Sequence, residues 1–301
     1  TPFILQYVFQ SFFITAERPT LGLLVTVAAG VTNIALDAVF VAGLRWGLEG
    51  AAAATVISQF VGGVIPLIYF LLPNNCTLKL TRAGFDGPAV WKTCTNGSSE
   101  LMTNVSISLV NMLYNFQLIR FAGEDGVAAY GVIMYVNFIF IGVFQGYAIG
   151  SAPIVGYHFG ARNQDELKSL FSKSLVLLGW AAVVLTALAE GLAGLLAGIF
   201  VSYDPELMAM TCRGFRIYST AFLMMGFNIF ASAFFTALND GLVSAFLSFL
   251  RTLVFQIAAV LILPVFLDLD GVWWSIAAAE GLALVVSGIC FWKFREKYHY
   301  L

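Results

Sequence analysis

Long apolar runs follow one another along almost the whole chain, with short polar stretches between them. A helix needs about 20 apolar residues to cross a bilayer, and backbone groups in hydrocarbon have to be satisfied within the segment, so spans are helices or closed barrels. No run shows the two-residue alternation of a barrel strand. The pattern predicts nine helical spans, at approximately residues 1–16, 20–43, 49–72, 100–121, 127–156, 171–200, 207–237, 243–267 and 271–293.

The first three of these spans recur in the second half of the chain. Residues 1–72 lie over residues 222–293 at a constant offset of 221 positions, without a gap. Two marks carry the match: S-x-F-x-T-A, and a leucine, an acid and a glycine in sequence. Because both marks keep register, we predict an all-α integral membrane protein with two homologous six-helix lobes, twelve helices when complete and about nine here.

The repeat also predicts how the chain is divided. The expected parts are the last three helices of the N-lobe (1–72), a cytoplasmic interlobe linker (73–98), a six-helix C-lobe (99–293) and a cytoplasmic tail (294–301). The counterpart of the start of the C-lobe would lie before Thr1. We therefore expect the chain to be a fragment that lacks three N-terminal helices.

Composition supports a membrane protein and the distribution of charge predicts its orientation. The chain is 60% hydrophobic and 11% charged, with a mean hydropathy of +0.88, which is more apolar surface than one soluble core would hide. Ten of the fifteen Lys and Arg residues fall in loops on one side or in the C-terminal tail, and acids dominate the opposite loops. The positive-inside rule then places the C-terminus in the cytoplasm.

Enzymatic chemistry has little support in this sequence. The two histidines, His158 and His299, have no carboxylate or cysteine at a useful spacing, and no P-loop, G-x-S-x-G or H-E-x-x-H motif is present. We therefore predict that the protein is not an enzyme, uses no cofactor, and is a transporter driven by something other than ATP on this chain.

One intramembrane acid is the leading candidate for an ion-coupling site. Asp37 lies well inside the second span, where a carboxylate is costly and is a functional hypothesis by default. Asn33 lies one helical turn earlier on the same face, and Thr55 lies at a similar depth on the next helix. At the equivalent positions the second half has Val254, Ala258 and Ile276, so the scaffold does not require polar groups there. A hydrogen-bonded clamp between helices is the alternative.

A polar stripe marks the first C-lobe helix. Asn104, Ser108, Asn111 and Asn115 recur at spacings of 4, 3 and 4 and so lie along one helical face. We interpret the stripe as a wall of a substrate cavity, with Glu100 near its cytoplasmic mouth, or else as interhelical hydrogen bonding. Three further sets are noted: Met225, from an adaptable surface rich in Met and Phe; the acids Glu190 and Glu280, with a packing or a binding role; and Arg213, Arg216 and Arg251, which we expect to pair with acids or to snorkel.

Three segments carry a family resemblance. AERPTLGLLVTVAAGVTNIALDAVFV (16–41), GLEGAAAATVISQ (47–59) and GYAIGSAPIVGYHFGARNQDELK (146–168) resemble the multidrug and toxic compound extrusion (MATE) family of secondary transporters. The resemblance covers essentially the whole chain, from the family's fourth helix to its twelfth. It implies two six-helix lobes around a central cavity and export of mostly cationic organic compounds in exchange for protons or sodium ions.

The resemblance also implies site residues. The Asn, Asp and Thr of the family's N-lobe cation site match Asn33, Asp37 and Thr55, so a sodium ion at Asp37 and Asn33 is one form of the expected site and a proton on Asp37 is the other. Some members use acids in the C-lobe cavity. The best-matched positions here are Ser108 and Met225, neither of them acidic, which favours coupling through the N-lobe.

The predicted function is therefore a proton- or sodium-coupled antiporter that exports organic cations and drugs by alternating access. We expect a monomer in the bacterial cytoplasmic membrane, surrounded by lipid, with small organic substrates and no nucleic-acid partner. The alternative is a flippase for lipid-linked oligosaccharides of the same superfamily. Its anionic pyrophosphate substrate calls for several cavity Lys or Arg, whereas the candidate cavity residues are mainly Asn, Ser and Asp.

Overall fold

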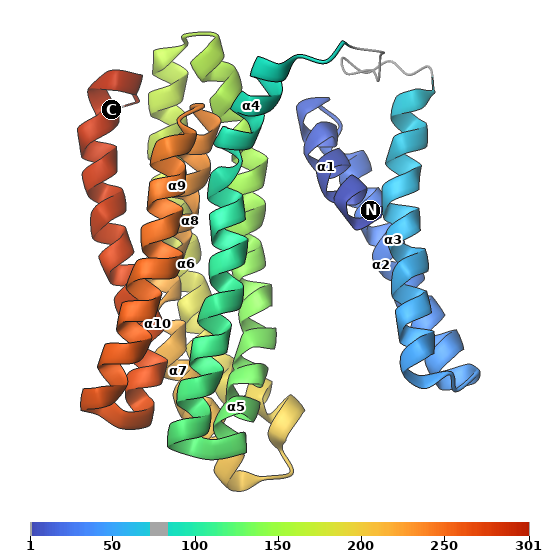
Figure 1. Cartoon of the computed structure of the whole chain (residues 1–301), viewed down its shortest axis with the longest axis vertical. Coiled ribbons are helices and arrows are strands. Elements are labelled where there is room, and N and C mark those ends of the chain that lie inside the picture. The colour runs from blue at the N-terminus through green and yellow to red at the C-terminus, as the bar shows by residue number, and fades with distance from the viewer. Residues whose placement is uncertain (1, 73–83, 301) are drawn as a thin grey trace. The chain divides into compact units, whose positions relative to one another are not determined.

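The computed structural model describes residues 2–72 and 84–300, all but a few of them in helices (Figure 1). The chain divides into two compact units, Thr1–Phe85 and Asp86–Leu301. The boundary between them falls inside the predicted linker, 73–98, of which residues 73–83 lie outside the described part of the chain.

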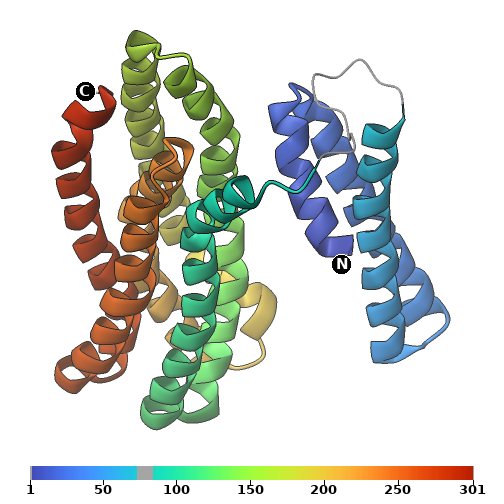
Figure 2. The same ribbon diagram turned by 45° about the horizontal axis from the view of Figure 1, so that its top comes forward.

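The N-terminal unit consists of three spans. They are α1 (Pro2–Thr15), α2 (Pro19–Asp37) continued by the π-helix η1 (Ala38–Gly43), and α3 (Gly47–Leu71). Figures 1 and 2 show the three spans packed against one another. Their core is aromatic, with the stacked rings of Phe9 and Phe70 5.5 Å apart and Phe13 tilted against Phe70 at 5.1 Å.

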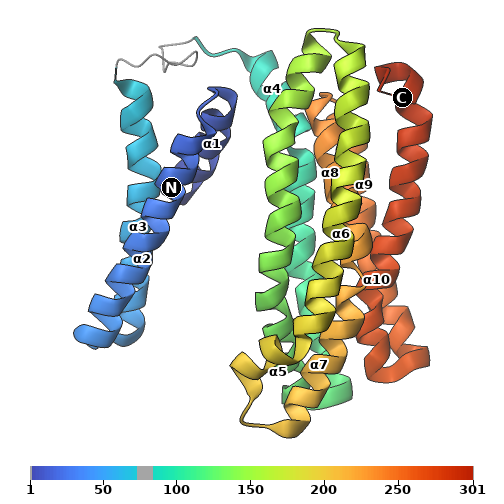
Figure 3. The same ribbon diagram turned by 180° about the vertical axis from the view of Figure 1, so that it is seen from behind.

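The C-terminal unit holds the other spans. Its elements are α4 (Gly87–Asn96), α5 (Ser98–Gly160), α6 (Gln164–Val201), α7 (Pro205–Ser219), α8 (Phe222–Ala237), α9 (Gly241–Phe249), the π-helix η2 (Leu250–Phe255) and α10 (Gln256–Tyr298). The helical geometry of α5 breaks at Gly123 and that of α10 at Asp268, so each contributes to two antiparallel spans (Figure 3). α7 and α8 form one span bent by 49°. The described residues thus contain the nine predicted helices, of which α1, with 14 residues, is shorter than a full membrane span.

The structure differs from the prediction at the linker and at the tail. The end of the linker is the helix α4, capped by Asp86, and Asn96 donates a hydrogen bond of 3.3 Å to the Thr236 carbonyl. The tail is also packed, because α10 runs on to Tyr298 and the fully buried Tyr300 donates to the Phe291 carbonyl at 2.9 Å. Both segments therefore belong to the C-terminal unit rather than to free loops.

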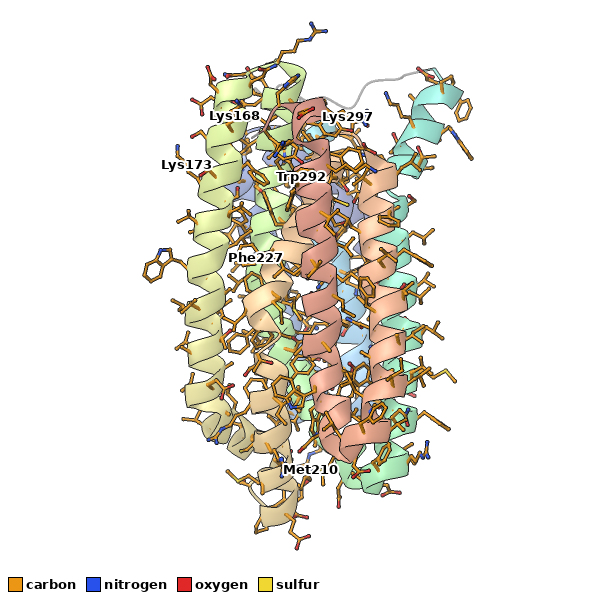
Figure 4. All side chains as sticks on the ribbon, turned by 90° about the vertical axis from the view of Figure 1, so that its left-hand side faces the viewer. Lys168, Lys173, Met210, Phe227, Trp292 and Lys297 are labelled. Carbon is orange, nitrogen blue, oxygen red and sulfur yellow. The ribbon has the colours of Figure 1, made fainter. Side chains whose placement is uncertain are left out.

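Basic residues gather at one end of the C-terminal unit. Lys168, Lys173 and Lys297 lie toward the same end of its helices, and Met210 lies at the opposite end (Figure 4). The α6 and α10 lysines that were assigned to one side of the membrane from sequence therefore share one end of this unit.

The glycine shared by the two halves lies where two segments of backbone touch. A Cβ built on Gly271 would lie 2.5 Å from the backbone C and O atoms of Leu263, and one on Gly50 would lie 3.2 Å from the backbone C of Phe40. Each glycine thus lets the start of one span approach the end of the preceding one. This contact explains why the leucine-acid-glycine mark recurs at 48–50 and 269–271.

We expect Gly271→Ala to destabilise the protein by about 1–3 kcal/mol, because backbone atoms cannot move aside as a flexible side chain does. The thermal unfolding midpoint in detergent measures the effect. Gly288→Ala is the matched control, since a Cβ there meets nothing within 4 Å. Replacing a helical glycine by alanine at such a position should stabilise the protein by roughly 0.5–1 kcal/mol. Equal midpoints for the two variants would contradict the close-contact explanation.

An acid in the turn between α8 and α9 holds the end of α10. Asp240 accepts hydrogen bonds from the Val243 amide at 3.3 Å, from Lys297 Nζ at 2.9 Å and from the Tyr298 hydroxyl. Burial opposes ionisation, but these hydrogen bonds outweigh it and lower the pKa of the Asp240 carboxyl below its ordinary value of 3.8. A lowered pKa stabilises the fold above pH 3.8, and this contribution is lost as the pH falls through the folded-state value.

Asp240→Asn is therefore expected to reduce stability at pH 7 by about 1 kcal/mol, and the difference from the wild type should shrink as the pH falls below 3.8. Thermal unfolding measured between pH 7 and pH 3 checks this. Asp204→Asn is the control, because Asp204 also caps a helix, accepting from the amides of Glu206 and Leu207, but has no basic partner in the described residues. A pH-independent difference for Asp240→Asn would refute the charge-based explanation.

Candidate functional site

The leading acid of the N-terminal unit lies where the helix geometry changes. Asp37 is the last residue of α2 and is followed directly by the π-helix η1. π-Helical turns are rare in proteins, and those that occur often lie at functional sites. Asn33 Nδ2 and Asp37 Oδ1 are both buried and without a hydrogen-bond partner. Buried polar atoms normally have partners, so this pair is available to a bound group.

Thr55 is placed differently from the other two predicted ion-site residues. Its side chain is exposed in the N-terminal unit, and its hydroxyl donates to the Ala51 carbonyl of its own helix at 2.9 Å. Within the described residues it makes no hydrogen bond to Asn33 or Asp37. The structure therefore places Asn33 and Asp37 on successive turns of one helix and leaves Thr55 outside that hydrogen-bonding set.

The chemistry of this pair suits a small cation. A carboxylate can accept a proton or contribute an oxygen to a sodium ion, and the Asn33 amide supplies either an oxygen ligand or a donor. Among the described residues no group of three or more His, Cys, Asp and Glu is gathered to hold a metal. The geometry is thus compatible with a proton on Asp37 and with a sodium ion that takes further oxygens from backbone or water.

A cavity of about 370 Å³ lies within the C-terminal unit. It is lined by aromatic, amide and thioether side chains with one charged pair. Its lining includes Asn111, Tyr114, Tyr130, Met134, Asn137, Tyr218, Met225, Arg251 and Glu280. Few polar groups on a largely apolar wall are typical of small-molecule sites.

The predicted polar stripe divides at this cavity. Asn111 lines it, Asn115 lines an adjoining hollow of about 350 Å³ together with Asn111, and Met225 lines the cavity from α8. Asn104 and Ser108 are exposed in the C-terminal unit and line neither space. The side chain of Glu100, the remaining predicted cavity residue, lies outside the described part of the chain.

A largely buried ion pair lies at the cavity wall. Arg251 of η2 donates from Nη2 to Glu280 Oε1 at 2.8 Å and from Nε to both carboxylate oxygens at 2.9 and 3.0 Å. Asn228 donates to Glu280 Oε2 at 2.7 Å and accepts from Ser287 at 3.0 Å. Removing either charge leaves the other without its partner in a low-dielectric region, so the two residues form one unit.

Two stacked tyrosines form another part of the wall. The rings of Tyr114 and Tyr130 are 5.2 Å apart and nearly parallel. Tyr130 donates to Asn111 Oδ1 at 2.9 Å, and the Tyr114 and Ser275 hydroxyls are 3.0 Å apart. Sequence reasoning missed these tyrosines, although Asn111 and Tyr114 lie one turn apart on the same helix, which was the available signal.

Glu190, the other intramembrane acid noted from sequence besides Glu280, has a local role in the structure. Glu190 of α6 accepts a hydrogen bond of 2.8 Å from the Ser219 hydroxyl, at the end of α7 where the span bends toward α8. It does not line the cavity of the C-terminal unit.

Comparisons with known proteins agree with this architecture. The MatE family model matches residues 101–262. Among curated proteins, the multidrug export protein MepA of Staphylococcus saprophyticus is 21% identical over 98% of this chain, and MepA of Staphylococcus aureus strain RF122 is 20% identical over 98%. The chain spans 64% of the length of each of these relatives.

Solved structures show the same fold. A crystal structure of MATE in complex with MaL6 matches with a TM-score of 0.92 at 21% identity, covering 99% of this chain and 68% of that one. A transporter of the MOP superfamily from Pyrococcus furiosus, described as having a binding pocket of reverse polarity, matches with a TM-score of 0.84 at 22% identity, covering 91% and 62%. The family match confirms the resemblance predicted from sequence: this chain belongs to the MatE family, whose members are transporters and not enzymes.

Proposed function

We propose that the whole protein is an ion-coupled exporter of small organic molecules. The observation that carries this proposal is the buried, unpartnered pair of polar atoms on Asn33 and Asp37, beside a π-helical turn in an apolar span. A carboxylate held in a membrane without a partner is costly unless it binds something. Similarity to multidrug export proteins supports the exporter reading.

In the proposed mechanism, Asp37 takes up a proton or a sodium ion from the outer side. Neutralising the carboxylate changes the hydrogen bonding it can make to Asn33 and so favours one arrangement of the lobes. An ion shifts such an equilibrium only by binding the two states with different affinity. Rocking of the lobes about a central site is the alternating access expected of transporters built from repeats.

Organic cations are the proposed substrates of the acid-containing lobe. A cationic group and the coupling ion carry the same charge, so both are attracted to the Asp37 carboxylate, and occupancy by one opposes occupancy by the other. This competition is the simplest form of exchange between an inward-moving ion and an outward-moving cation.

A flippase for lipid-linked oligosaccharides has less support from the charges observed. Among the described lining residues, the cavity of the C-terminal unit has a single basic side chain, Arg251, and that side chain is paired with Glu280. A pyrophosphate group calls for several basic partners.

The proposed location is the cytoplasmic membrane of a bacterium, with the C-terminus in the cytoplasm. The gathering of Lys168, Lys173 and Lys297 at one end of the C-terminal unit supports this orientation (Figure 4). We propose that the protein works as a monomer.

Ethidium efflux from energised cells that lack other pumps tests the proposed function. The proton and sodium gradients are collapsed separately in cells that produce the whole protein. We expect efflux that stops when one gradient, and not the other, is removed, which also names the coupling ion. Efflux no faster than in cells without the protein would overturn the proposal.

A further inference from the structure

The more exposed member of the charged pair in the cavity of the C-terminal unit is the guanidinium and not the carboxylate. Both residues of the pair line the cavity, but the Glu280 side chain is completely buried whereas the Arg251 side chain is 15% exposed. Both Glu280 oxygens are occupied by Arg251, and Oε2 also by Asn228. The acid is therefore screened from a ligand, and a cation in this cavity would meet Arg251 first.

Arg251 still has hydrogen-bonding capacity toward the cavity. Its contacts with Glu280 use Nε and Nη2, and Nη1 has no partner among the described residues. A guanidinium carries five donors in a planar fork and binds carboxylates with charge-assisted hydrogen bonds. Arg251 Nη1 can thus donate hydrogen bonds to an anionic group.

Two further polar side chains in the lining lack partners. Asn137 is 4% exposed, its Oδ1 is buried without a hydrogen bond, and Tyr218, 3% exposed, makes no hydrogen bond within the described residues. Polar groups so deeply buried are normally satisfied. In the same cavity, the Tyr218 hydroxyl can donate to an oxyanion that the guanidinium attracts, whereas the unpartnered Asn137 Oδ1 is an acceptor and suits a donor group elsewhere on the ligand.

The rest of the lining suits a flat apolar body. The stacked pair of Tyr114 and Tyr130 offers an aromatic face, and Met134 and Met225 adapt to irregular shapes. From these observations we propose that the cavity of the C-terminal unit binds flat aromatic compounds that carry a carboxylate, with the carboxylate on Arg251 Nη1 and the Tyr218 hydroxyl.

The two halves of the repeat then differ in polarity. Residues 30 and 59, the positions equivalent to Arg251 and Glu280, are Gly30 and Gln59, just as the equivalents of Asn33 and Asp37 in the second half are apolar. The helical scaffold therefore requires neither the Arg251–Glu280 pair nor the Asn33–Asp37 pair. The N-terminal unit offers a carboxylate to cations and the C-terminal unit offers a guanidinium to anions, so the inference rests on the proposed transport function and widens its substrate class.

Three tricyclic probes of similar size test the proposal: anthracene-9-carboxylate, the neutral 9-anthracenemethanol and the cationic 9-aminoacridine. Binding to the whole protein in lipid nanodiscs is measured by fluorescence anisotropy at neutral pH, with partitioning into empty nanodiscs subtracted. We expect the carboxylate to bind roughly 10- to 100-fold more tightly than the neutral alcohol, the range that charge-assisted hydrogen bonds provide.

Two variants separate ligand binding from a structural role of the ion pair. In Glu280→Gln the guanidinium loses its competing counter-ion, so the affinity for the carboxylate is expected to rise. In the double variant Arg251→Gln with Glu280→Gln no charge is buried, and the preference for the carboxylate over the alcohol is expected to disappear. A purely structural pair would give no increase in the first variant and no selective loss in the second.

The proposal is overturned if the carboxylate binds no more tightly than the alcohol, or if 9-aminoacridine binds most tightly and loses its affinity in Glu280→Gln. Asp37→Asn is the control that keeps this proposal apart from the coupling mechanism. Because the assay uses no ion gradient, Asp37→Asn is expected to retain carboxylate binding even where ion-driven efflux fails.

Discussion

Asp37→Asn in the whole protein is expected to reduce ion-driven efflux at least about tenfold, toward the level of membranes without the protein. The substitution keeps the size and shape of the side chain at the end of α2 but removes the carboxylate that we propose takes up a proton or a sodium ion. Efflux driven by an imposed proton or sodium gradient in proteoliposomes measures the effect. The loss should hold for whichever ion drives the wild type.

Two companion variants define what the result means. Glu49→Gln changes an exposed acid in the first turn of α3, in the same unit, and should leave efflux unchanged. Asn33→Leu, which removes the adjacent buried amide, should weaken ion dependence without abolishing it, because the carboxylate remains. Wild-type efflux and unchanged ion dependence in Asp37→Asn would show that Asp37 is not the coupling site.

Much of the fold could be predicted from sequence because a bilayer leaves the backbone few choices. Each apolar run of sufficient length had to be a helix, and the breaks at Gly123 and Asp268 fall where the runs are interrupted by acids. The polar character of 87–96 and 294–300 argued for loops, but α4 and the end of α10 are helical because they pack on α9 and on the aromatic core around Phe291.

The candidate sites were less predictable because they depend on contacts between distant segments. From the sequence, Glu280 could have a packing or a binding role, and Arg213, Arg216 and Arg251 were expected to pair with acids or to snorkel. Which arginine pairs with Glu280 depends on tertiary contacts, since Arg251 pairs with Glu280 whereas Arg213 pairs with Asp270, next to the break in α10. The same holds for Thr55, which matched the family pattern by position although its hydroxyl bonds within its own helix.

The π-helices η1 and η2 were also beyond prediction. Nothing in the apolar period of residues 38–43 or 250–255 distinguishes them from ordinary helix. Yet η1 follows Asp37 directly and η2 contains Arg251, so the corresponding span of each repeat carries a π-helical turn beside its intramembrane charge. Since π-helical turns are frequent at functional sites, we interpret both as local distortions that orient the side chains of Asp37 and Arg251.

Removing one partner of the Arg251–Glu280 ion pair is expected to have the largest effect on stability. Arg251→Gln leaves the completely buried Glu280 carboxylate without its counter-ion, which should destabilise the protein by about 3–5 kcal/mol. Glu280→Gln should cost less, because the Arg251 side chain is partly exposed to the cavity and keeps some contact with water. Thermal unfolding of the purified protein in detergent ranks the two variants.

The double variant, with Gln at both positions, closes the cycle. It buries no unpaired charge, and exchanging a buried ion pair for neutral groups of similar volume is often close to neutral, so its stability should lie nearer the wild type than that of Arg251→Gln. The coupling energy from the cycle then measures the interaction itself. Single-variant losses that simply add in the double variant would show that Arg251 and Glu280 stabilise the fold independently. Equal losses for the two single variants would show that the cavity does not solvate Arg251, and this would also remove the exposed guanidinium edge on which anion binding depends.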